Sequence, residues 1–280
     1  MSVFVSPDWL VKRMEEYPDH TAIVDVRFSL GDSSAGETAY QESHIPGAVY
    51  LDLNKHLSSS VQNHGGNHPL PDMDDFSEKL GEVGIDQETT VIIYDQHNDM
   101  FSARMWWLLH YAGHQYAYIL DGGFDRWQKQ GNVTTNKVPV PSVKHFYPAE
   151  RSDEVVHMEE VKEKVKKGSA VLLDSRAKER YLGKNEPLYQ KAGHIPGAKN
   201  YFWKGVLGEN GGWKDKAALQ AHFAPLSETD EIIVSCGSGV SACPNILGLK
   251  MAGYSNVKLY PGSFSDWISY PENDVPTEEE

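Results

Sequence analysis

Residues 44–48 read HIPGA, and the same five letters recur at residues 194–198. Two more segments repeat in the same order: VDVR at 24–27 matches LDSR at 173–176, and DGGFDRW at 121–127 matches PGSFSDW at 261–267. The copies are offset by 140 to 150 residues, which is the size of a domain rather than of a solenoid repeat. We therefore predict two copies of one fold within the 280 residues.

Short apolar runs alternate with helical stretches in each half. Apolar or β-branched runs, too short for helices, occupy residues 21–26, 90–94, 170–174 and 231–235. Helical stretches follow at 102–111 and 242–251, and a glycine stop follows each of them. This alternation predicts an α/β fold with two similar domains, each a mainly parallel sheet covered by helices on both faces.

A proline-containing stretch separates the two halves. It includes Pro139, Pro141 and Pro148 and lacks helical periodicity. Proline restricts the residue before it to extended conformations, which suits a semi-rigid connector. We predict domains at residues 1–138 and 153–280, joined by a linker at 139–152.

Composition excludes several classes of partner. The formal net charge of -14 disfavours non-specific binding to nucleic acid and to anionic membranes. The first ten residues lack a signal-peptide pattern, and the apolar stretch at 105–109 is too short to span a bilayer. Two cysteines do not make a disulfide framework. We expect a cytoplasmic protein without nucleic-acid or membrane partners.

The residues after the run at 231–235 are the first candidates for chemistry, because ligands of parallel sheets bind beyond the carboxyl ends of strands. Cys236 stands there, followed by GSGVS at 237–241. The glycines allow a tight loop with amide N–H groups turned inward, and the helix that follows adds partial positive charge. Both effects favour a thiolate, so Cys236 is predicted to be the catalytic nucleophile. An inert buried thiol is the alternative.

Two comparisons inside the sequence refine this prediction. Cys243 lies in the first turns of the helix without such a loop, so we expect a small core residue, with a resolving redox role as the alternative. Aligning the two halves places Asp95 opposite Cys236. Because a carboxylate cannot replace a thiolate nucleophile, the N-terminal copy is predicted to be non-catalytic.

Together these segments resemble the tandem-domain rhodanese family, the thiosulfate and 3-mercaptopyruvate sulfurtransferases, over nearly the whole chain. The loop CGSGVS at 236–241 is similar to the mercaptopyruvate type CGSGVT, with Ser241 keeping the hydroxyl. Thiosulfate-type loops usually carry basic residues directly after the cysteine. The resemblance implies that the loop residues hold the sulfur and the substrate: Gly237, Ser238, Gly239, Val240 and Ser241.

Other site residues follow from the resemblance one by one. Arg180 matches an arginine that points at the sulfur and the substrate carboxylate, a role suited to a two-pronged cation. His68 matches a histidine that contacts substrate, but the acidic partner of that histidine aligns with Asn54. Phe28 and Phe101 fall at aromatic positions of the cleft entrance, with ordinary core packing as the alternative.

The resemblance is incomplete after Arg180. A second arginine of animal mercaptopyruvate enzymes is missing, and Lys191 is the expected substitute as a point charge in the cleft. The sulfur donor therefore stays open between 3-mercaptopyruvate and thiosulfate. Arg176 has a copy, Arg27, in the non-catalytic half, so we expect a structural role for it, such as a buried pair with Asp174.

The implied reaction is a double displacement through a Cys236 persulfide, with cyanide, a small thiol or reduced thioredoxin as acceptor. It requires no metal and no organic cofactor. A cysteine phosphatase is disfavoured because the loop lacks an arginine at its end. A persulfide carrier that serves a biosynthetic partner remains the alternative. Metal binding by His64 and His68 is disfavoured because the glycine-rich spacer provides no helical face.

Overall fold

The computed structural model describes residues 3–278, and the chain divides into two compact units. The first unit contains the chain up to Ser59, Pro71–Arg151 and Glu209–Trp213. The second contains Ser60–Leu70, Ser152–Gly208 and the chain from Lys214 onward. Each unit is thus built mostly from one half of the sequence and completed by a short loop from the other half.

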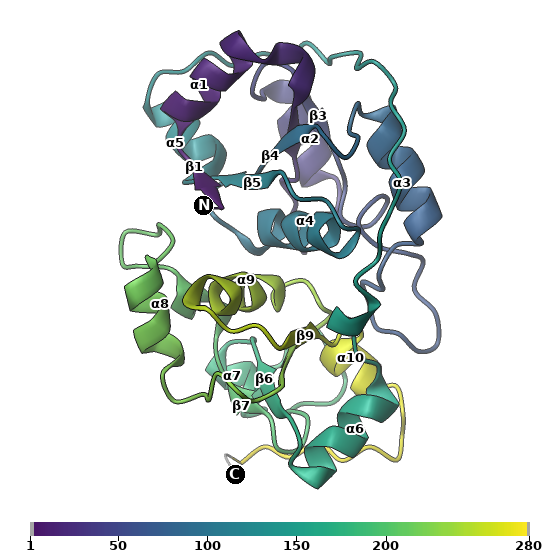
Figure 1. The fold of residues 1–280 in the computed structure, drawn as a ribbon. Coiled ribbons are helices and arrows are strands. Elements are labelled where there is room, and N and C mark those ends of the chain that lie inside the picture. The colour runs from purple at the N-terminus through teal and green to yellow at the C-terminus, as the bar shows by residue number, and fades with distance from the viewer. Residues whose placement is uncertain (1–2, 279–280) are drawn as a thin grey trace. The chain divides into compact units, whose positions relative to one another are not determined.

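The first unit is built on a five-stranded parallel sheet (Figure 1). Its strand order is β1 (Phe4–Val5), β5 (Ala117–Leu120), β4 (Thr90–Tyr94), β2 (Thr21–Asp25) and β3 (Ala48–Tyr50). Its helices are α1 (Pro7–Glu16), α2 (Ala35–Glu42), α3 (Met73–Glu82), α4 (Met100–Tyr111) and α5 (Gly123–Lys129), with a 3₁₀ turn η1 (Pro18–His20). Figure 1 shows α4 on one side of this sheet and α1 and α5 on the other.

The second unit repeats the pattern with a four-stranded parallel sheet. The strand order is β7 (Lys199–Asn200), β6 (Val171–Asp174), β8 (Ile232–Ser235) and β9 (Val257–Leu259). Its helices are α6 (Met158–Lys167), α7 (Lys178–Tyr181), α8 (Lys216–Phe223), α9 (Cys243–Ala252) and α10 (Ser263–Trp267), with 3₁₀ turns η2 (Ser152–Glu154) and η3 (Trp203–Val206). The predicted α/β class with two similar parallel-sheet domains is confirmed.

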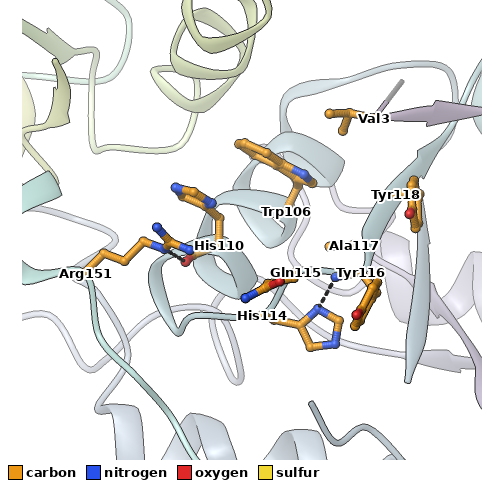
Figure 2. Close-up of a pocket in the computed structure, with 9 residues that line it drawn as sticks. All are labelled: Val3, Trp106, His110, His114, Gln115, Tyr116, Ala117, Tyr118 and Arg151. Carbon is orange, nitrogen blue, oxygen red and sulfur yellow. Dashed lines mark hydrogen bonds between the residues drawn. The ribbon is translucent and has the colours of Figure 1, made fainter. Parts of the chain in front are cut away.

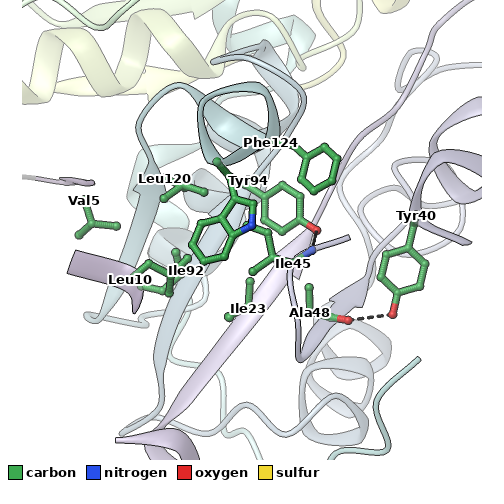
Figure 3. Close-up of a cluster of buried hydrophobic side chains, with 11 residues drawn as sticks. Val5, Leu10, Ile23, Tyr40, Ile45, Ala48, Ile92, Tyr94, Leu120 and Phe124 are labelled. Carbon is green, nitrogen blue, oxygen red and sulfur yellow. Dashed lines mark hydrogen bonds between the residues drawn. The ribbon is translucent and has the colours of Figure 1, made fainter. Parts of the chain in front are cut away.

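Side chains alternate across the central strand of the first sheet. Ile92 and Tyr94 pack with Leu10 of α1 and Phe124 of α5 in one buried cluster (Figure 3). Ile93 points the other way by the period of two and is also fully buried. A parallel sheet buried on both faces explains why this segment reads as a continuous β-branched run.

The repeated HIPGA segment has the same structural role in both units. The His44 ring stacks on Tyr40 with centroids 4.0 Å apart, and its Nδ1 lies 2.6 Å from the Tyr40 carbonyl oxygen. His194 stacks on Tyr181 at 3.9 Å, with its Nδ1 2.9 Å from the Tyr181 carbonyl oxygen. Both histidines are fully buried just before a strand, which favours a structural role for them.

The repeated arginine is also structural. Arg27 donates to both carboxylate oxygens of Asp25, and Arg176 does the same to Asp174, with both pairs buried. Each arginine also donates to a backbone carbonyl, that of Ser43 or Gly193. The expected buried pair is confirmed. Breaking one partner of such a pair leaves an uncompensated buried charge, which typically costs about 3–5 kcal/mol.

Candidate active site

Cys236 stands directly after β8, at the carboxyl end of a strand that lies inside the sheet. Ser235 is in register with Asp174 of β6, just as Tyr94 is in register with Asp25 of β2. Asp95 therefore occupies the position of Cys236 in the first unit, as the alignment of the halves predicted.

The backbone frame around this position is duplicated. The N–H of Phe264 donates to the carbonyl of Cys236 at 3.0 Å, and the N–H of Ser265 donates to the carbonyl of Gly237 at 2.8 Å. In the first unit, Phe124 and Asp125 donate in the same way to the residues at 95 and 96, both at 2.9 Å. One strand-to-loop corner thus holds a carboxylate in one half and a thiol in the other.

The sulfur of Cys236 is buried, and the N–H of Gly239 donates to it at 3.1 Å. Gly239 has φ +77°, and a Cβ there would lie 2.4 Å from the carbonyl oxygen of Pro261, so only glycine fits. The sequence led us to expect several amides around the sulfur. Within residues 3–278, the amide that meets the hydrogen-bond criteria to this sulfur is that of Gly239.

Ser263 was missed by the sequence analysis. It has φ +54°, and its hydroxyl accepts the N–H of Cys236 at 3.0 Å while donating to the Tyr260 carbonyl at 2.8 Å. The matching position in the first unit is Gly123, with φ +56°. The replacement of glycine by serine in the otherwise similar GGF and GSF segments is the sequence signal that could have revealed it.

His68 reaches the cysteine loop within the second unit. Its Nδ1 lies 2.7 Å from the hydroxyl oxygen of Ser238. The segment before it is fixed on the loop around α10: Gly65 N–H donates to Asp266 Oδ1 at 2.7 Å, and Asn67 N–H donates to Ser265 Oγ at 3.1 Å. His68 therefore contacts the cysteine loop, and its predicted contact with substrate stays a prediction.

His64 points to a different partner. Its Nδ1 lies 2.8 Å from Ser269 Oγ, and its ring stacks on Tyr270 with centroids 4.1 Å apart. Within residues 3–278, no group of three or more His, Cys, Asp or Glu side chains is arranged to hold a metal ion.

Arg180 is held by Glu186, a residue that the sequence analysis did not single out. Nε and Nη2 of Arg180 donate to the Glu186 carboxylate, at 2.8 Å for the Nη2 to Oε1 pair. The Glu186 side chain is 1% exposed, and Arg176 also donates to it at 3.2 Å. The guanidinium of Arg180 therefore has a fixed orientation, and part of its donor set is already used.

The remaining predicted residues are distributed over both units. Val240 is buried, and Ser241 and Lys191 are half-buried in the second unit. In the first unit, Phe28 and Phe101 pack edge to face with centroids 5.5 Å apart. The N–H of Asn54 donates to Asp52 Oδ1 at 2.8 Å. The cleft-lining role of Phe28, Asn54, Phe101 and Lys191 stays a prediction.

Cys243 is fully buried at the start of α9 and donates its S–H to the Gly239 carbonyl at 3.4 Å. The peptide units of Gly239 therefore contact both sulfurs: its N–H donates to Cys236, and its carbonyl accepts from Cys243. This contact favours the expected role of Cys243 as a core residue that supports the loop.

A cavity of about 360 Å³ lies in the first unit, between α4 and the beginning of β5 (Figure 2). Trp106 and His110 of α4 stack in parallel at its wall, and Arg151 Nε donates to the His110 carbonyl at 3.0 Å. The lining contains none of the predicted site residues. Within residues 3–278, no helix is long and apolar enough to cross a membrane.

Known proteins share this architecture and sequence. The model of the rhodanese-like domain matches residues 6–130 and again 157–270. A Pseudomonas aeruginosa protein named "Probable 3-mercaptopyruvate sulfurtransferase" is 37% identical over 273 residues, which is 96% of this chain and 95% of the relative. The thiosulfate sulfurtransferase of Cricetulus griseus is 29% identical, covering 94% of this chain and 91% of that protein.

A solved structure from the same class of enzymes also matches this chain. The crystal structure of SseA from Escherichia coli, described as a 3-mercaptopyruvate sulfotransferase with the rhodanese fold, superposes with a TM-score of 0.83. It is 32% identical and covers 95% of this chain and 100% of that one. The chain belongs to the rhodanese family. It is a two-domain sulfurtransferase, which acts between a sulfur donor and a sulfur acceptor.

Proposed function

We propose that this protein moves sulfane sulfur from 3-mercaptopyruvate or thiosulfate to a thiol or cyanide through a persulfide on Cys236. The observation that carries the proposal is the environment of the Cys236 sulfur. It is buried at the carboxyl end of β8, and a glycine N–H donates to it at 3.1 Å. An amide at this distance stabilises negative charge on the attacking thiolate and on the persulfide formed from it.

The sulfur transfer occurs in two balanced steps. The Cys236 thiolate attacks the sulfane sulfur, a new S–S bond forms, and the bond from that sulfur to the rest of the donor breaks. With 3-mercaptopyruvate, the electron pair leaves on carbon as the pyruvate enolate, which takes up a proton. With thiosulfate, the pair leaves on sulfite. An acceptor such as cyanide, a small thiol or reduced thioredoxin then removes the outer sulfur and restores the thiolate.

Other residues of the site have supporting roles in this proposal. Gly237, Ser238, Gly239, Val240 and Ser241 form the loop that holds the sulfur and the donor. His68 contacts the donor through Ser238, and Arg180 attracts its carboxylate. We further propose catalytic and non-catalytic domains at residues 153–280 and 1–138, and a cytoplasmic location.

Replacing Cys236 by serine tests the function. Serine keeps the size and a polar atom but cannot form a persulfide, so Cys236→Ser should lose at least about 10³-fold of the turnover while keeping the fold. Thiocyanate formation from each donor with cyanide measures turnover, and circular dichroism measures folding. Cys243→Ser is the matched control and should keep most of the activity. Turnover near wild type in Cys236→Ser contradicts the proposal.

The same assay separates an enzyme from a carrier. Mass spectrometry after mixing with donor detects the added sulfur on Cys236 directly. Persulfide formation followed by rapid transfer to cyanide or to a small thiol supports the enzyme. A persulfide that forms but stays on the protein with every small acceptor identifies a carrier that delivers sulfur to a protein partner.

A further inference from the structure

Tyr189 lies against the cysteine loop. A Cβ at Gly237 would lie 2.7 Å from the Tyr189 hydroxyl oxygen and 3.5 Å from two of its ring atoms, so glycine at 237 leaves the space for this tyrosine. The ring packs edge to face on Phe264 at 5.8 Å, and the Arg180 guanidinium carbon lies 5.4 Å from its centroid. The position of the hydroxyl is therefore fixed from several sides.

The hydroxyl lies close to two other hydrogen-bonding groups. It is beside Gly237, the residue before Ser238, and the Ser238 hydroxyl lies 2.7 Å from Nδ1 of His68. Burial, and next the negative charge on Cys236, raise the pKa of Tyr189, so its hydroxyl stays protonated at neutral pH. Three groups that can exchange protons thus lie side by side next to the reactive sulfur.

The charged groups near these three residues largely compensate each other. Arg180 donates through Nε and Nη2 to Glu186, and Arg176 donates to Asp174 and Glu186. Two guanidinium groups therefore face two carboxylates. Because these pairs leave little net positive charge for a donor, a second negative charge on the donor gains little attraction here.

We propose, on the premise of the proposed function, that Tyr189 is a positioning residue that makes the site prefer a monoanionic thiol donor of the 3-mercaptopyruvate class over dianionic thiosulfate. With Ser238 and His68, it holds such a donor by neutral hydrogen bonds. The proton requirements of the two donors also favour the thiol donor. When the carbon–sulfur bond of the thiol donor breaks, the enolate must take up a proton, whereas sulfite leaves thiosulfate with no proton transfer. Groups that exchange protons therefore assist only the first donor.

The test measures how fast each donor loads sulfur onto Cys236 in a single turnover, by quenching and mass spectrometry. The probes are 3-mercaptopyruvate and thiosulfate, applied to the full chain as wild type, Tyr189→Phe and Tyr189→Arg. Tyr147→Phe is the matched control, because Tyr147 is an exposed tyrosine of the first unit. Circular dichroism and thermal unfolding check that every variant is folded.

Tyr189→Phe should slow loading from saturating 3-mercaptopyruvate about 10-fold, with loading from thiosulfate changed less than twofold. The half-saturating concentration of 3-mercaptopyruvate should change less than the loading rate. Tyr189→Arg should raise the loading rate from thiosulfate relative to 3-mercaptopyruvate, because it adds an uncompensated charge. Tyr147→Phe should load like the wild type.

Two outcomes overturn the assignment. An equal loss with both donors in Tyr189→Phe identifies a purely structural residue, and unchanged loading from 3-mercaptopyruvate excludes the role altogether. Both outcomes leave the proposed function intact if the wild type is loaded. If the wild type is loaded by neither donor, or Cys236→Ser is loaded as well, the proposed function fails and this inference fails with it.

Discussion

At the scale of single residues, the second half of the chain differs from the first by a few substitutions at one corner. Cys236 replaces Asp95, and Ser263 replaces Gly123, while the two backbone hydrogen bonds that frame the corner are the same in both halves. Burial, and next the charge of Asp99, raise the pKa of Asp95, which accepts the N–H groups of Asp99 and Ser102. The corner thus holds an ionisable side chain in either half, but only the sulfur can store a second sulfur atom.

Ser263 provides the residue-scale prediction. Its left-handed backbone costs roughly 1–2 kcal/mol relative to glycine, and its hydrogen bonds return a similar amount. Ser263→Gly should therefore change the unfolding free energy by less than about 1 kcal/mol, whereas Ser263→Ala keeps the strain, loses the hydrogen bonds and should destabilise by about 1–2 kcal/mol. Urea unfolding measures both.

Activity measurements show whether the Ser263 hydroxyl positions Cys236 or only stabilises the fold. Both variants remove the acceptor of the Cys236 N–H, so both should slow persulfide formation. If Ser263→Gly is as active as the wild type, the hydroxyl does not position the cysteine.

At the scale of elements, loop 60–70 is the part of the first half that completes the second unit. It delivers His68 to Ser238 and is fixed by backbone hydrogen bonds from Gly65 and Asn67. Gly66, between them, has φ +83°, and a Cβ there would lie 2.4 Å from the carbonyl oxygen of Gly262. The close approach of this loop to α10 therefore depends on a glycine.

Gly66 and Gly65 form a matched pair for the element-scale prediction. Gly65 also has a positive φ, +96°, but a Cβ there has nothing within 4 Å. Gly65→Ala should cost only the backbone strain, about 1–2 kcal/mol. Gly66→Ala should cost more and should also lower kcat/KM for the sulfur donor, because the clash lifts the segment that carries His68. Equal kcat/KM in the two variants shows that the loop does not position this histidine.

At the scale of the whole molecule, three histidines make the stability of the fold depend on pH. Burial is the main cause that lowers the pKa of His56, His114 and His222 below the ordinary value of 6.5. Each therefore stays neutral down to a lower pH in the folded chain than in the unfolded chain. Their contribution to stability is therefore complete above pH 6.5 and is lost as the pH falls through the folded-state pKa values.

His56 allows this pH dependence to be tested. Its Nδ1 accepts the N–H of Asp52 at 2.8 Å, and an asparagine oxygen can accept the same bond without titrating. Between pH 7.5 and 5.5, His56→Asn should lose less unfolding free energy than the wild type. The exposed His20→Asn is the control and should follow the wild type. Parallel curves for His56→Asn and wild type in urea unfolding refute the assignment.

The sequence predicts the fold well because its signals are repeated and local. The run at 90–94 is β4 as predicted, and the helix predicted at 242–251 is α9 at Cys243–Ala252. Cys236 and its loop were singled out because a cysteine directly after a buried strand is a local pattern. Glu186, Ser263 and Tyr189 were not found, because their roles depend on contacts with other segments, such as that of Tyr189 with Gly237, 48 positions away along the chain.

The loops 60–70 and 209–213 follow equivalent strands, β3 and β7, and each belongs to the unit built by the opposite half. In the first unit, Trp213 stacks on Phe4 at 4.7 Å, and the Gly211 carbonyl accepts from Asn98 at 3.1 Å. Gene fission would leave each loop on the wrong polypeptide: a product starting at residue 153 would lack His68, and one ending at 138 would lack Trp213. A recombinant protein that takes one half from a distant homologue should fold poorly for the same reason. The two halves must therefore be inherited together in one reading frame.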